Sequence, residues 1–586
     1  MIAGTIDFTA GYLPRLTAFA GALGRAGPVE VLADLRLDEP EELAAAFGCA
    51  PDASPADIVA AAWLSRKEAA LPLLRGDFAL AIVDHRTGEV VLARDHVGIR
   101  PLYWYRHGRE LRFSGDLADL VARCPEAPID DVFFAAQLIR PFALLPAMNV
   151  RTLHVGLLKL PGGHVAVFGG RRETRVTRWM NWWNCPDVRF RKIDDYAEAL
   201  RERLSHSIRR AVRTEGPIAS HLSGGIDGTA VTILADKHLR LDGRKLDRAY
   251  TWFAGPSEDV PGGEDTWSLA KLVAQNLSVP LHEMPATFDS QFAMAAADPF
   301  GRPMHMLDYE MRVLAHASSH GVGVILSGWG GDEVVSTRRL AGWHDLLRCG
   351  RWYMAARLWR AGIRPRRSLK AALLGWGRHG VLGPFLPSLP MGDTIFLRAL
   401  SLPFIHQDMV ERVLVDDDYA PMRRVRAERG YRPTLISQLE DGHLARRCES
   451  WAMAAADYGI THRYPLLDRE LLAFCLGLPP ELPYIDGRPR ALLRLALKTL
   501  VPHEIREGDK PRETNRVARL ARADDLALDR LLEQARHTEA PSLDWIDSEC
   551  IGRVLAHRGA GPVDRLIQRQ AATVVLAARG WKNVLR

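Results

Sequence analysis

The chain has 586 residues, of which 47% are hydrophobic and 25% are charged, a balance typical of a globular protein with a substantial core. This length exceeds that of one ordinary domain, so we expect more than one. The net charge of +6 is small for the length, suits a protein that handles anionic ligands, and gives no indication of nucleic-acid binding.

Signals for export and for membrane insertion are missing from the sequence. The first residues, MIAGTIDFTAGYLPRL, lack the basic start and apolar run of a signal peptide. No uncharged apolar stretch approaches the ~18 residues of a membrane span. The 7 cysteines are dispersed without CxxC pairs, which is typical of reduced thiols. We therefore expect a cytoplasmic protein without stable membrane insertion.

The first part of the chain, up to about residue 180, predicts a domain rich in antiparallel strands. Short apolar or alternating runs between Gly, Asp or Pro indicate strands at Phe78–Val83, Glu89–Arg94, Leu102–Tyr105 and His164–Phe168. A segment crowded with tryptophan and asparagine follows and ends at Cys185, where we place a domain boundary. The predicted domains are residues 1–185 and 186–586.

Beyond this boundary, helices alternate with strands. Helical periodicity is found at Ile193–Thr214, Thr229–His238 and Asp265–Leu277. Buried-type strands are indicated at Pro217–Leu222, Arg248–Phe253, Val279–Met284 and Val322–Leu326. This alternation predicts crossover units, a parallel sheet and therefore an α/β fold, followed from about Arg339 by a mostly helical extension.

The glycine loop SGGIDG (residues 223–228) directly follows the first strand of the predicted parallel sheet. Two glycines allow the backbone to approach a ligand closely, and the free N–H groups of a helix start attract phosphate. In a parallel sheet, ligands bind at the carboxyl ends of strands, where this loop lies. An ordinary strand-to-helix turn would also use glycine, so this loop alone does not establish a nucleotide site.

A second loop, SGWGGDE (residues 327–333), follows another strand of the same sheet. Each loop therefore places one carboxylate, Asp227 or Asp332, at the carboxyl end of a strand. Either aspartate alone could be a helix N-cap. Two carboxylates that meet over one polyphosphate would hold Mg²⁺, which prefers oxygen ligands. The pair of loops thus favours a Mg²⁺-nucleotide site.

Several segments, in order along the chain, resemble the asparagine synthetase group of N-type ATP pyrophosphatases. HLSGGIDG is similar to the group's pyrophosphate loop SGGxDS, and ILSGWGGDE to its second loop. RYPLLDRELLAFCLGLPPEL (residues 463–482) resembles the R-x-P-[FL]-L-D stretch, and the likeness continues to Lys510. Residues 74–105 resemble the group's glutaminase-type (Ntn-type) domain. The resemblance implies a four-layered αββα domain followed by an α/β synthetase domain.

The resemblance also implies roles for individual residues. It assigns the ATP phosphates to Ser223, Gly224, Gly225 and Asp227. It assigns Mg²⁺ to Asp227 and Asp332, and the border of the adenosine to Leu222 and Phe253.

Five further positions belong to the implied nucleotide site. Lys510 would neutralise charge on the transferring phosphate and on the departing pyrophosphate, which calls for a fixed cation. Gly228 stands where the group usually has serine, and the sequence leaves open whether Thr229 replaces that hydroxyl. In the second loop, Gly328 and Trp329 complete the predicted nucleotide-binding set.

Two differences from the group's usual sequence indicate which amine attacks the activated carboxylate. Its glutaminases use an N-terminal cysteine, whereas this sequence begins Met1-Ile2-Ala3 and its first cysteine is Cys49, so we expect no glutamine hydrolysis. This leaves members that take an amine from the substrate, namely β-lactam synthetases and lasso-peptide cyclases. β-lactam synthetases have a tyrosine in the second loop, while Trp329 resembles the lasso-cyclase version.

We therefore expect a lasso-peptide cyclase, which uses ATP to join a peptide's N-terminal amine to an Asp or Glu side chain through an acyl-adenylate. Tryptophan cannot act as a base. Glu333 and Glu449 are the candidate general bases, although either could equally be a salt-bridge partner. The resemblance suggests three partners, namely a precursor peptide, a leader peptidase and a leader-binding protein.

Two alternatives remain open from the sequence. One is a β-lactam-synthetase-like or other small-molecule amide synthetase, and the other is a non-enzymatic scaffold, to which only Gly228 points. The basic, aromatic stretch Leu346–Gly392 suits a groove for an acidic peptide, a partner contact, a membrane-surface helix or a solvated helical face. No RNA-binding motif accompanies it.

Overall fold

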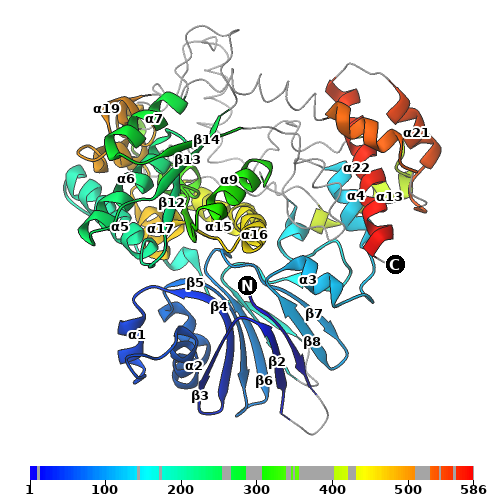
Figure 1. Cartoon of the computed structure of the whole chain (residues 1–586), viewed down its shortest axis with the longest axis horizontal. Coiled ribbons are helices and arrows are strands. Elements are labelled where there is room, and N and C mark those ends of the chain that lie inside the picture. The colour runs from blue at the N-terminus through cyan, green and yellow to red at the C-terminus, as the bar shows by residue number, and fades with distance from the viewer. Residues whose placement is uncertain are drawn as a thin grey trace.

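A computed structural model describes residues 1–8, 13–140, 145–169, 174–253, 266–285, 307–337, 345–346, 350–354, 401–419, 430–508, 528–539, 543–557 and 562–584. The chain is a two-domain α/β protein, with antiparallel sheets in the N-terminal part and a parallel sheet flanked by helices in the C-terminal part (Figure 1). The two-domain α/β prediction is confirmed, while the boundary at residue 185 stays a prediction.

Two antiparallel sheets pack face to face in the N-terminal part. The five-stranded sheet has the order β2 (Arg15–Ala20), β1 (Ala3–Asp7), β8 (Glu110–Ser114), β7 (Tyr103–His107) and β9 (Leu157–Lys159). The six-stranded sheet has the order β11 (Arg175–Arg178), β10 (His164–Phe168), β6 (Glu89–Arg94), β5 (Gly76–Asp84), β4 (Val29–Leu37) and β3 (Ala22–Ala26).

Helices cover the outer faces of both sheets and complete four layers. On β5, Leu80 and Ile82 pack toward α2 (Pro55–Arg66), while Ala79 and Ala81 pack toward the other sheet. Both faces of this strand are buried, which is why its sequence is a nearly continuous apolar run. The short helix α3 (Leu117–Ala122) covers the five-stranded sheet. The αββα layering implied by the resemblance is thus present.

The parallel sheet of the C-terminal part has its strand order reversed at its centre. The order is β14 (Leu281–Pro285), β13 (Arg248–Phe253), β12 (Ile218–His221), β15 (Val324–Leu326) and β16 (Thr461–Arg463). The chain runs outward from β12 to β14 and then returns to β15 on the other side of β12. Ligands of open α/β sheets bind at such a switch point, beyond the carboxyl ends of the strands.

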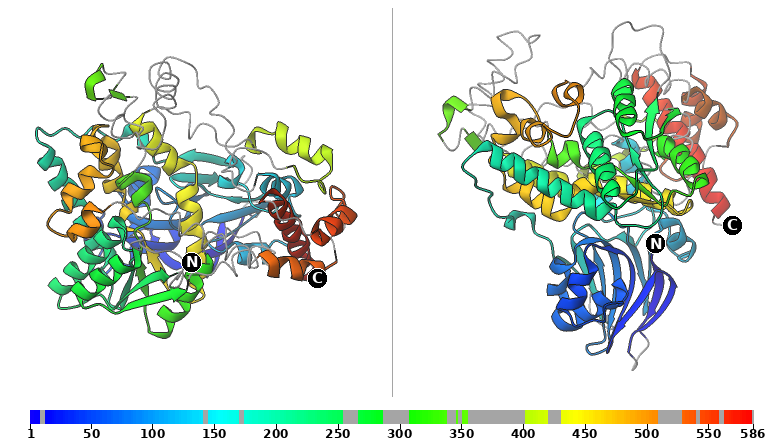
Figure 2. Two further views of the ribbon diagram at one scale, coloured as in Figure 1. Left: turned by 90° about the horizontal axis from the view of Figure 1, so that it is seen from above. Right: turned by 60° about the vertical axis from the view of Figure 1, so that its left-hand side comes forward.

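Helices cover both faces of this sheet, as the two turned views show (Figure 2). One face carries α5 (Ile193–Ala211), α6 (Ile226–Leu241), α7 (Thr266–Leu277) and α17 (Arg469–Gly477). The other face carries α9 (Leu307–Ser319) and α16 (His443–Ala456). Strand residues alternate between the two cores, since Ile218 packs in the first and Ala219 in the second.

A separate helical cluster, at the right of Figure 1, joins the end of the chain to the N-terminal part. It consists of α4 (Asp131–Ile139), α13 (Gln407–Val415), α21 (Ser548–Ala556) and α22 (Pro562–Val584). The mostly helical extension also contains one strand that the sequence did not predict, β16. Its three residues, Thr461-His462-Arg463, are too few and too polar to show alternation. Among the described residues, no helix has the length and apolarity needed to cross a bilayer.

A buried ion cluster joins the two parts of the chain. Glu449 on α16 lies 2.9 Å from Arg94 Nη2 and 3.0 Å from Lys159 Nζ, both in the N-terminal sheets. The side chains of Glu449 and Arg94 are completely buried. Burial alone would raise the pKa of Glu449, but Lys159 and Arg94 outweigh it and hold this pKa below its usual value. The carboxylate is thus needed to neutralise two buried cations.

We expect Glu449→Gln to destabilise the protein by about 3–5 kcal/mol, because it leaves both cations without a buried counter-charge. Urea unfolding measures this loss. Glu440→Gln is the matched control, since Glu440 also bridges to the N-terminal part but pairs with the half-exposed Arg178, and should cost less than about 1 kcal/mol. Equal losses in the two variants would contradict this assignment.

Candidate active site

The two glycine loops leave the sheet side by side. β12 and β15 are paired in parallel, with Ser220 opposite Leu326, so their carboxyl ends lie at the same edge. In the first loop, Gly224 has a φ of +73°, a left-handed conformation that favours glycine. Gly225 then caps the amino end of α6, which directs its free N–H groups at this edge.

The second loop touches the first so closely that only glycine fits. Gly330 has a φ of +94° and precedes a π-helical turn, Gly331–Val335. A Cβ atom on Gly328 would lie 2.8 Å from the nitrogen of Gly228, and one on Gly331 would lie 2.5 Å from Cγ of Asp227. The glycines of SGWGGDE therefore permit the two loops to pack against each other at the switch point.

Asp227 and Asp332 converge on one cation, the guanidinium of Arg490. Oδ2 of Asp227 lies 3.2 Å from Nη1 of Arg490, and Asp332 forms an ion pair with Nη2. Arg490 is 4% exposed, has a φ of +63°, and caps α18 (Ala491–Ala496). This arginine could not be identified from the sequence, because Arg490 lies far along the chain from both loops and its own left-handed conformation directs it toward them.

The residues present fit a divalent cation. The guanidinium shows that both carboxylates reach a single positive charge, and Oδ1 of Asp227 is buried without a hydrogen-bond partner among the described residues. Carboxylate oxygens are the ligands that Mg²⁺ prefers. Asp227 and Asp332 could therefore hold Mg²⁺ once Arg490 moves aside.

Other residues predicted at the nucleotide site differ in accessibility. Ser223 is exposed beside the amino end of α6, whereas the side chain of Leu222 is fully buried in the core, so that only its main chain can reach a ligand. The hydroxyl of Thr229 is buried inside the domain. Phe253 ends β13, but its side chain and the whole of Lys510 lie outside the described residues, as does most of the stretch Leu346–Gly392.

Gly228 has room for part of a larger side chain. A Cβ atom there would lie 3.2 Å from the carbonyl oxygen of His221 and 3.7 Å from Oγ of Ser223. A serine at this position, as the resemblance would have it, therefore needs a shift of only a few tenths of an ångström. The departure at Gly228 removes a hydroxyl group without reshaping the loop.

Of the two candidate general bases, Glu333 has the suitable environment. It lies on the π-helical turn beside Asp332, and Nε2 of His443 is 3.9 Å from its carboxylate. Burial raises the pKa of Glu333, and the nearby charge of Asp227 adds to this effect. A carboxyl group with a raised pKa beside a phosphate site is suited to accept a proton. Glu449, by contrast, is a buried salt-bridge partner with a lowered pKa, which favours the salt-bridge interpretation that the sequence left open.

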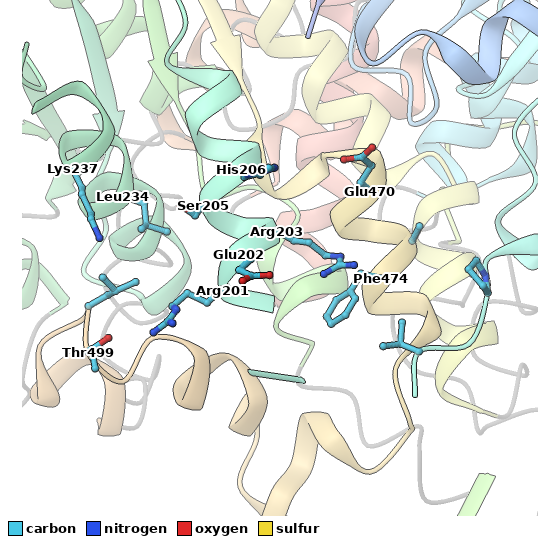
Figure 3. A pocket seen from close by; sticks show the side chains of 14 residues that line it. Arg201, Glu202, Arg203, Ser205, His206, Leu234, Lys237, Glu470, Phe474 and Thr499 are labelled. Carbon is cyan, nitrogen blue, oxygen red and sulfur yellow. The ribbon is translucent and has the colours of Figure 1, made fainter. Parts of the chain in front are cut away.

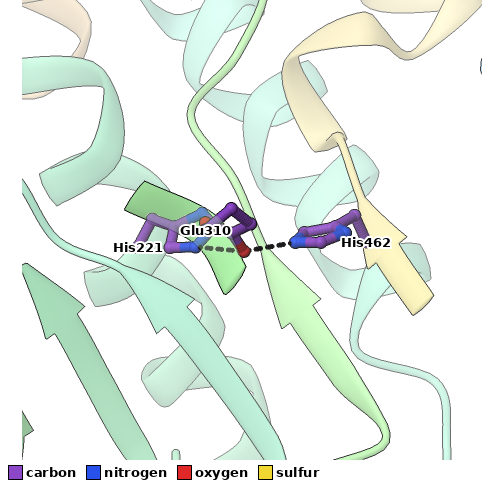
Figure 4. A group of neighbouring side chains, drawn as sticks. All are labelled: His221, Glu310 and His462. Atoms are coloured by element: carbon purple, nitrogen blue, oxygen red, sulfur yellow. Dashed lines mark hydrogen bonds and ion pairs between the residues drawn. The ribbon is translucent and has the colours of Figure 1, made fainter. Parts of the chain in front are cut away.

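A buried cluster of two histidines and a glutamate lies at the carboxyl end of β12, next to the first loop (Figure 4). Nε2 of His221 and Nε2 of His462 lie 3.1 Å and 2.6 Å from the same oxygen of Glu310. Burial alone would raise the pKa of Glu310, but the two histidines outweigh it and lower this pKa to about 2. His221 lies in a strand that the sequence predicts, whereas the strand of His462 was missed, and nothing in the sequence showed that the two histidines share one partner.

This cluster also has a donor set that divalent metals accept, since its ligand atoms lie within 4.8 Å of one another. Metal-bound histidines are normally oriented by a partner on the second ring nitrogen. Nδ1 of His221 and Nδ1 of His462 are buried and have no partner among the described residues. We therefore interpret the cluster as a hydrogen-bonded support of strands β12 and β16.

A cleft of about 1130 Å³ lies at the other end of α6, between α5 and α17 (Figure 3). Arg201 and Arg203 of α5, Lys237 of α6 and Phe474 of α17 are among its lining residues. Lys237 is ten residues beyond Asp227 on α6, hence about 15 Å along the helix. None of the loop residues lines this cleft, so we do not assign it to the chemistry.

Comparison with known proteins agrees with this arrangement. The asparagine synthase family matches residues 199–583, and the glutamine amidotransferase domain family matches residues 40–181. The chain therefore belongs to the asparagine synthase family, whose members are ATP-dependent amide-forming ligases.

Individual relatives are distant. Amidase chry2 of Gibberella zeae is 22% identical over 74% of this chain and 68% of its own length. Asparagine synthetase [glutamine-hydrolyzing] 1 of Bacillus subtilis is 24% identical over 77% of this chain and 70% of its own length. For asparagine synthetase 2 of B. subtilis, also 24% identical, the match spans only 44% of this chain and 36% of the relative.

Among solved structures, glutamine phosphoribosylpyrophosphate amidotransferase from B. subtilis is 11% identical and covers 49% of this chain and 75% of its own, with a TM-score of 0.22. That likeness is too weak to carry an argument.

We expect Gly331→Ala to reduce ATP–pyrophosphate exchange about 100-fold, because the new methyl group would displace the carboxylate of Asp227. Gly323→Ala, just before β15, is the control, because a Cβ atom there meets nothing within 4 Å. Exchange is measured with radiolabelled pyrophosphate, after circular dichroism has shown that both variants are folded. Full exchange in Gly331→Ala would disprove the close packing of the loops.

The buried cluster predicts a specific acid sensitivity. The pKa of Glu310 is lowered from 4.5 to about 2 in the folded protein, so its charge stabilises the fold above pH 4.5. This contribution is lost as the pH falls toward about 2. Glu310→Gln should therefore reduce the slope of unfolding free energy against pH in this window by up to about 1.4 kcal/mol per pH unit. Urea unfolding between pH 6 and 3 tests this, with the exposed Glu283→Gln as control.

Proposed function

We propose that this protein is a lasso-peptide cyclase, which forms an isopeptide bond between a peptide's N-terminal amine and an Asp or Glu side chain, and releases AMP and pyrophosphate. The observation that carries this proposal is the meeting of Asp227 and Asp332 on one cation, at the switch point of an asparagine synthase-family sheet.

Phosphate binding is supported by the first loop. The first N–H groups of α6 have no hydrogen-bond acceptor within the helix, and Ser223 is exposed beside them. Asp227 and Asp332 would hold Mg²⁺, and this ion, when bound, neutralises phosphate charge. Arg490 would then be released from the two carboxylates. Its positive charge would remain close to the bound phosphates.

The reaction proceeds in two balanced steps. A carboxylate oxygen of the substrate attacks the α-phosphorus of ATP, a new P–O bond forms, and the bond to the departing pyrophosphate breaks. The substrate's amine then attacks the carbonyl carbon of the acyl-adenylate, and the C–O bond to phosphate breaks as AMP leaves. Glu333, with its raised pKa, takes the proton from the amine. The long peptide supplies the orientation that brings amine and adenylate together.

The amine is proposed to come from the substrate itself. Ile2 and Ala3, at the beginning of β1, are buried in the core and carry no thiol. In the second loop, Trp329 replaces the tyrosine expected of a β-lactam synthetase, and its ring packs against His443 and Arg447. A leader peptidase and a leader-binding protein remain proposed partners.

Incubation of the protein with ATP, Mg²⁺ and candidate core peptides should give a product lighter by one water, together with AMP. The double variant Asp227→Asn/Asp332→Asn should lose at least about 100-fold in rate, because it removes both carboxylates that would hold the metal. Asp242→Asn is the matched control, with an exposed acid at the far end of α6. Mass spectrometry and nucleotide chromatography provide the readouts.

Three outcomes would refute the proposal. Release of ADP in place of AMP would show that the carboxylate is not adenylated. Undiminished cyclisation by the double variant would show that the two aspartates do not serve the nucleotide. Activity with small amines and small acids, and none with peptides, would assign the protein to the small-molecule amide synthetases.

A further inference from the structure

Arg447 is a buried cation that forms no ion pair with any described residue. It lies on α16 and is 8% exposed. Its Nε is buried without a hydrogen-bond acceptor, and within the described part of the chain its guanidinium forms neither a hydrogen bond nor an ion pair. Burial of a charged group without a counter-charge is costly, so natural proteins usually pair such groups. Arg447 therefore differs from Arg94 and Arg490, which have carboxylate partners.

Two tryptophan rings hold the guanidinium between them. Its Cζ lies 4.3 Å from the ring centroid of Trp329 and 4.0 Å from that of Trp451. Stacking of this kind stabilises a cation and fixes the plane of the guanidinium. Trp329 belongs to the second loop, three residues before Asp332, so the stacked arginine lies beside the proposed nucleotide site.

The stack rests on the buried histidine–glutamate cluster. The ring of Trp451 is completely buried and lies 5.3 Å from His221 and 5.0 Å from His462, measured between ring centroids. Both histidines are fixed by Glu310. Arg447 is thus held in one orientation from the interior of the protein, which is the arrangement needed for a preorganised recognition group.

The planar fork of a guanidinium matches a carboxylate, to which it can donate two parallel hydrogen bonds. Burial lowers the pKa of Arg447, and the electrostatic effects of Tyr464, Glu310 and Glu333 oppose this change without outweighing it. An incoming carboxylate would supply the missing counter-charge. Such a ligand is the chemical group that the proposed function must bind beside ATP.

We propose that Arg447 binds the substrate carboxylate that becomes adenylated, an inference that rests on the proposed function. One carboxylate oxygen stays on the guanidinium while the other attacks the α-phosphorus. When the amine adds to the acyl-adenylate, negative charge forms on the oxygen held by Arg447, and the guanidinium stabilises it. The C–O bond to AMP then breaks, and the proton of the amine passes to Glu333.

The test compares two probes that differ only in charge, N-acetylglutamic acid α-amide and N-acetylglutamine α-amide. Binding is followed by tryptophan fluorescence, since two indoles flank the guanidinium. The wild-type protein should bind the carboxylate at least about tenfold more tightly than the carboxamide. Arg447→Gln should abolish this preference, and Arg447→Lys, which keeps the charge but not the fork, should retain only part of it.

Arg446→Gln is the matched control, because Arg446 lies next in the sequence and its Nη1 contacts the sulfur of Met148 instead of the stack. It should keep the full preference. A wild-type protein that binds neither probe, or binds both equally, overturns the inference, as does an unchanged preference in Arg447→Gln. Weaker AMP binding in Arg447→Gln with an unchanged carboxylate preference would assign the arginine to phosphate and also overturn it.

These outcomes are separable from a failure of the proposed function. The binding measurement needs no turnover, so a carboxylate preference that depends on Arg447 supports the inference even if no cyclised product forms. Conversely, a protein that cyclises peptides and whose Arg447→Gln variant keeps normal kcat and KM retains its proposed function without this role for the arginine.

Discussion

The parallel pairing of β12 with β15 is the constraint on which the candidate site depends. Because the two strands end at one edge, the loops after them are forced into contact, and Gly328 and Gly331 are the residues that permit it. The same contact brings Asp227 and Asp332 to a common cation. Neither loop would form the site alone, since each supplies one carboxylate and the first also supplies the helix start.

Some buried charged residues stabilise the fold, and others are available to bind ligands. The two kinds differ in whether neighbouring protein groups compensate their charge. Glu449 and Glu310 are each satisfied by two cationic or hydrogen-bonding groups and are therefore structural. Glu333 has a raised pKa, and Arg447 has aromatic neighbours in place of an anion. The two residues whose charges are poorly compensated both border the second glycine loop, where the reacting groups would bind.

Local patterns were sufficient to predict half of the described strands, including four of the five in the parallel sheet, together with the order of the two domains and the two glycine loops, since each is encoded within a few adjacent residues. The stack around Arg447 and the position of Arg490 could not be predicted, because each joins segments far apart in the sequence. Glu310 lies 89 residues from His221 and 152 from His462, for example. Glu449 was ambiguous for the same reason, since its partners come from the other part of the chain. The roles assigned to Lys510 and Phe253 stay predictions.

The ion pairs of Arg490 with the two aspartates affect which form of a metal can bind. Two carboxylates and one guanidinium together carry a single negative charge, so they attract a free divalent cation less strongly than the two carboxylates alone would. The free energy of binding of a free calcium or zinc ion at this site is therefore reduced. A metal ion that is already bound to a nucleotide brings phosphate groups, which can pair with the displaced guanidinium of Arg490. The site therefore favours binding of the metal–nucleotide complex over binding of the free metal ion.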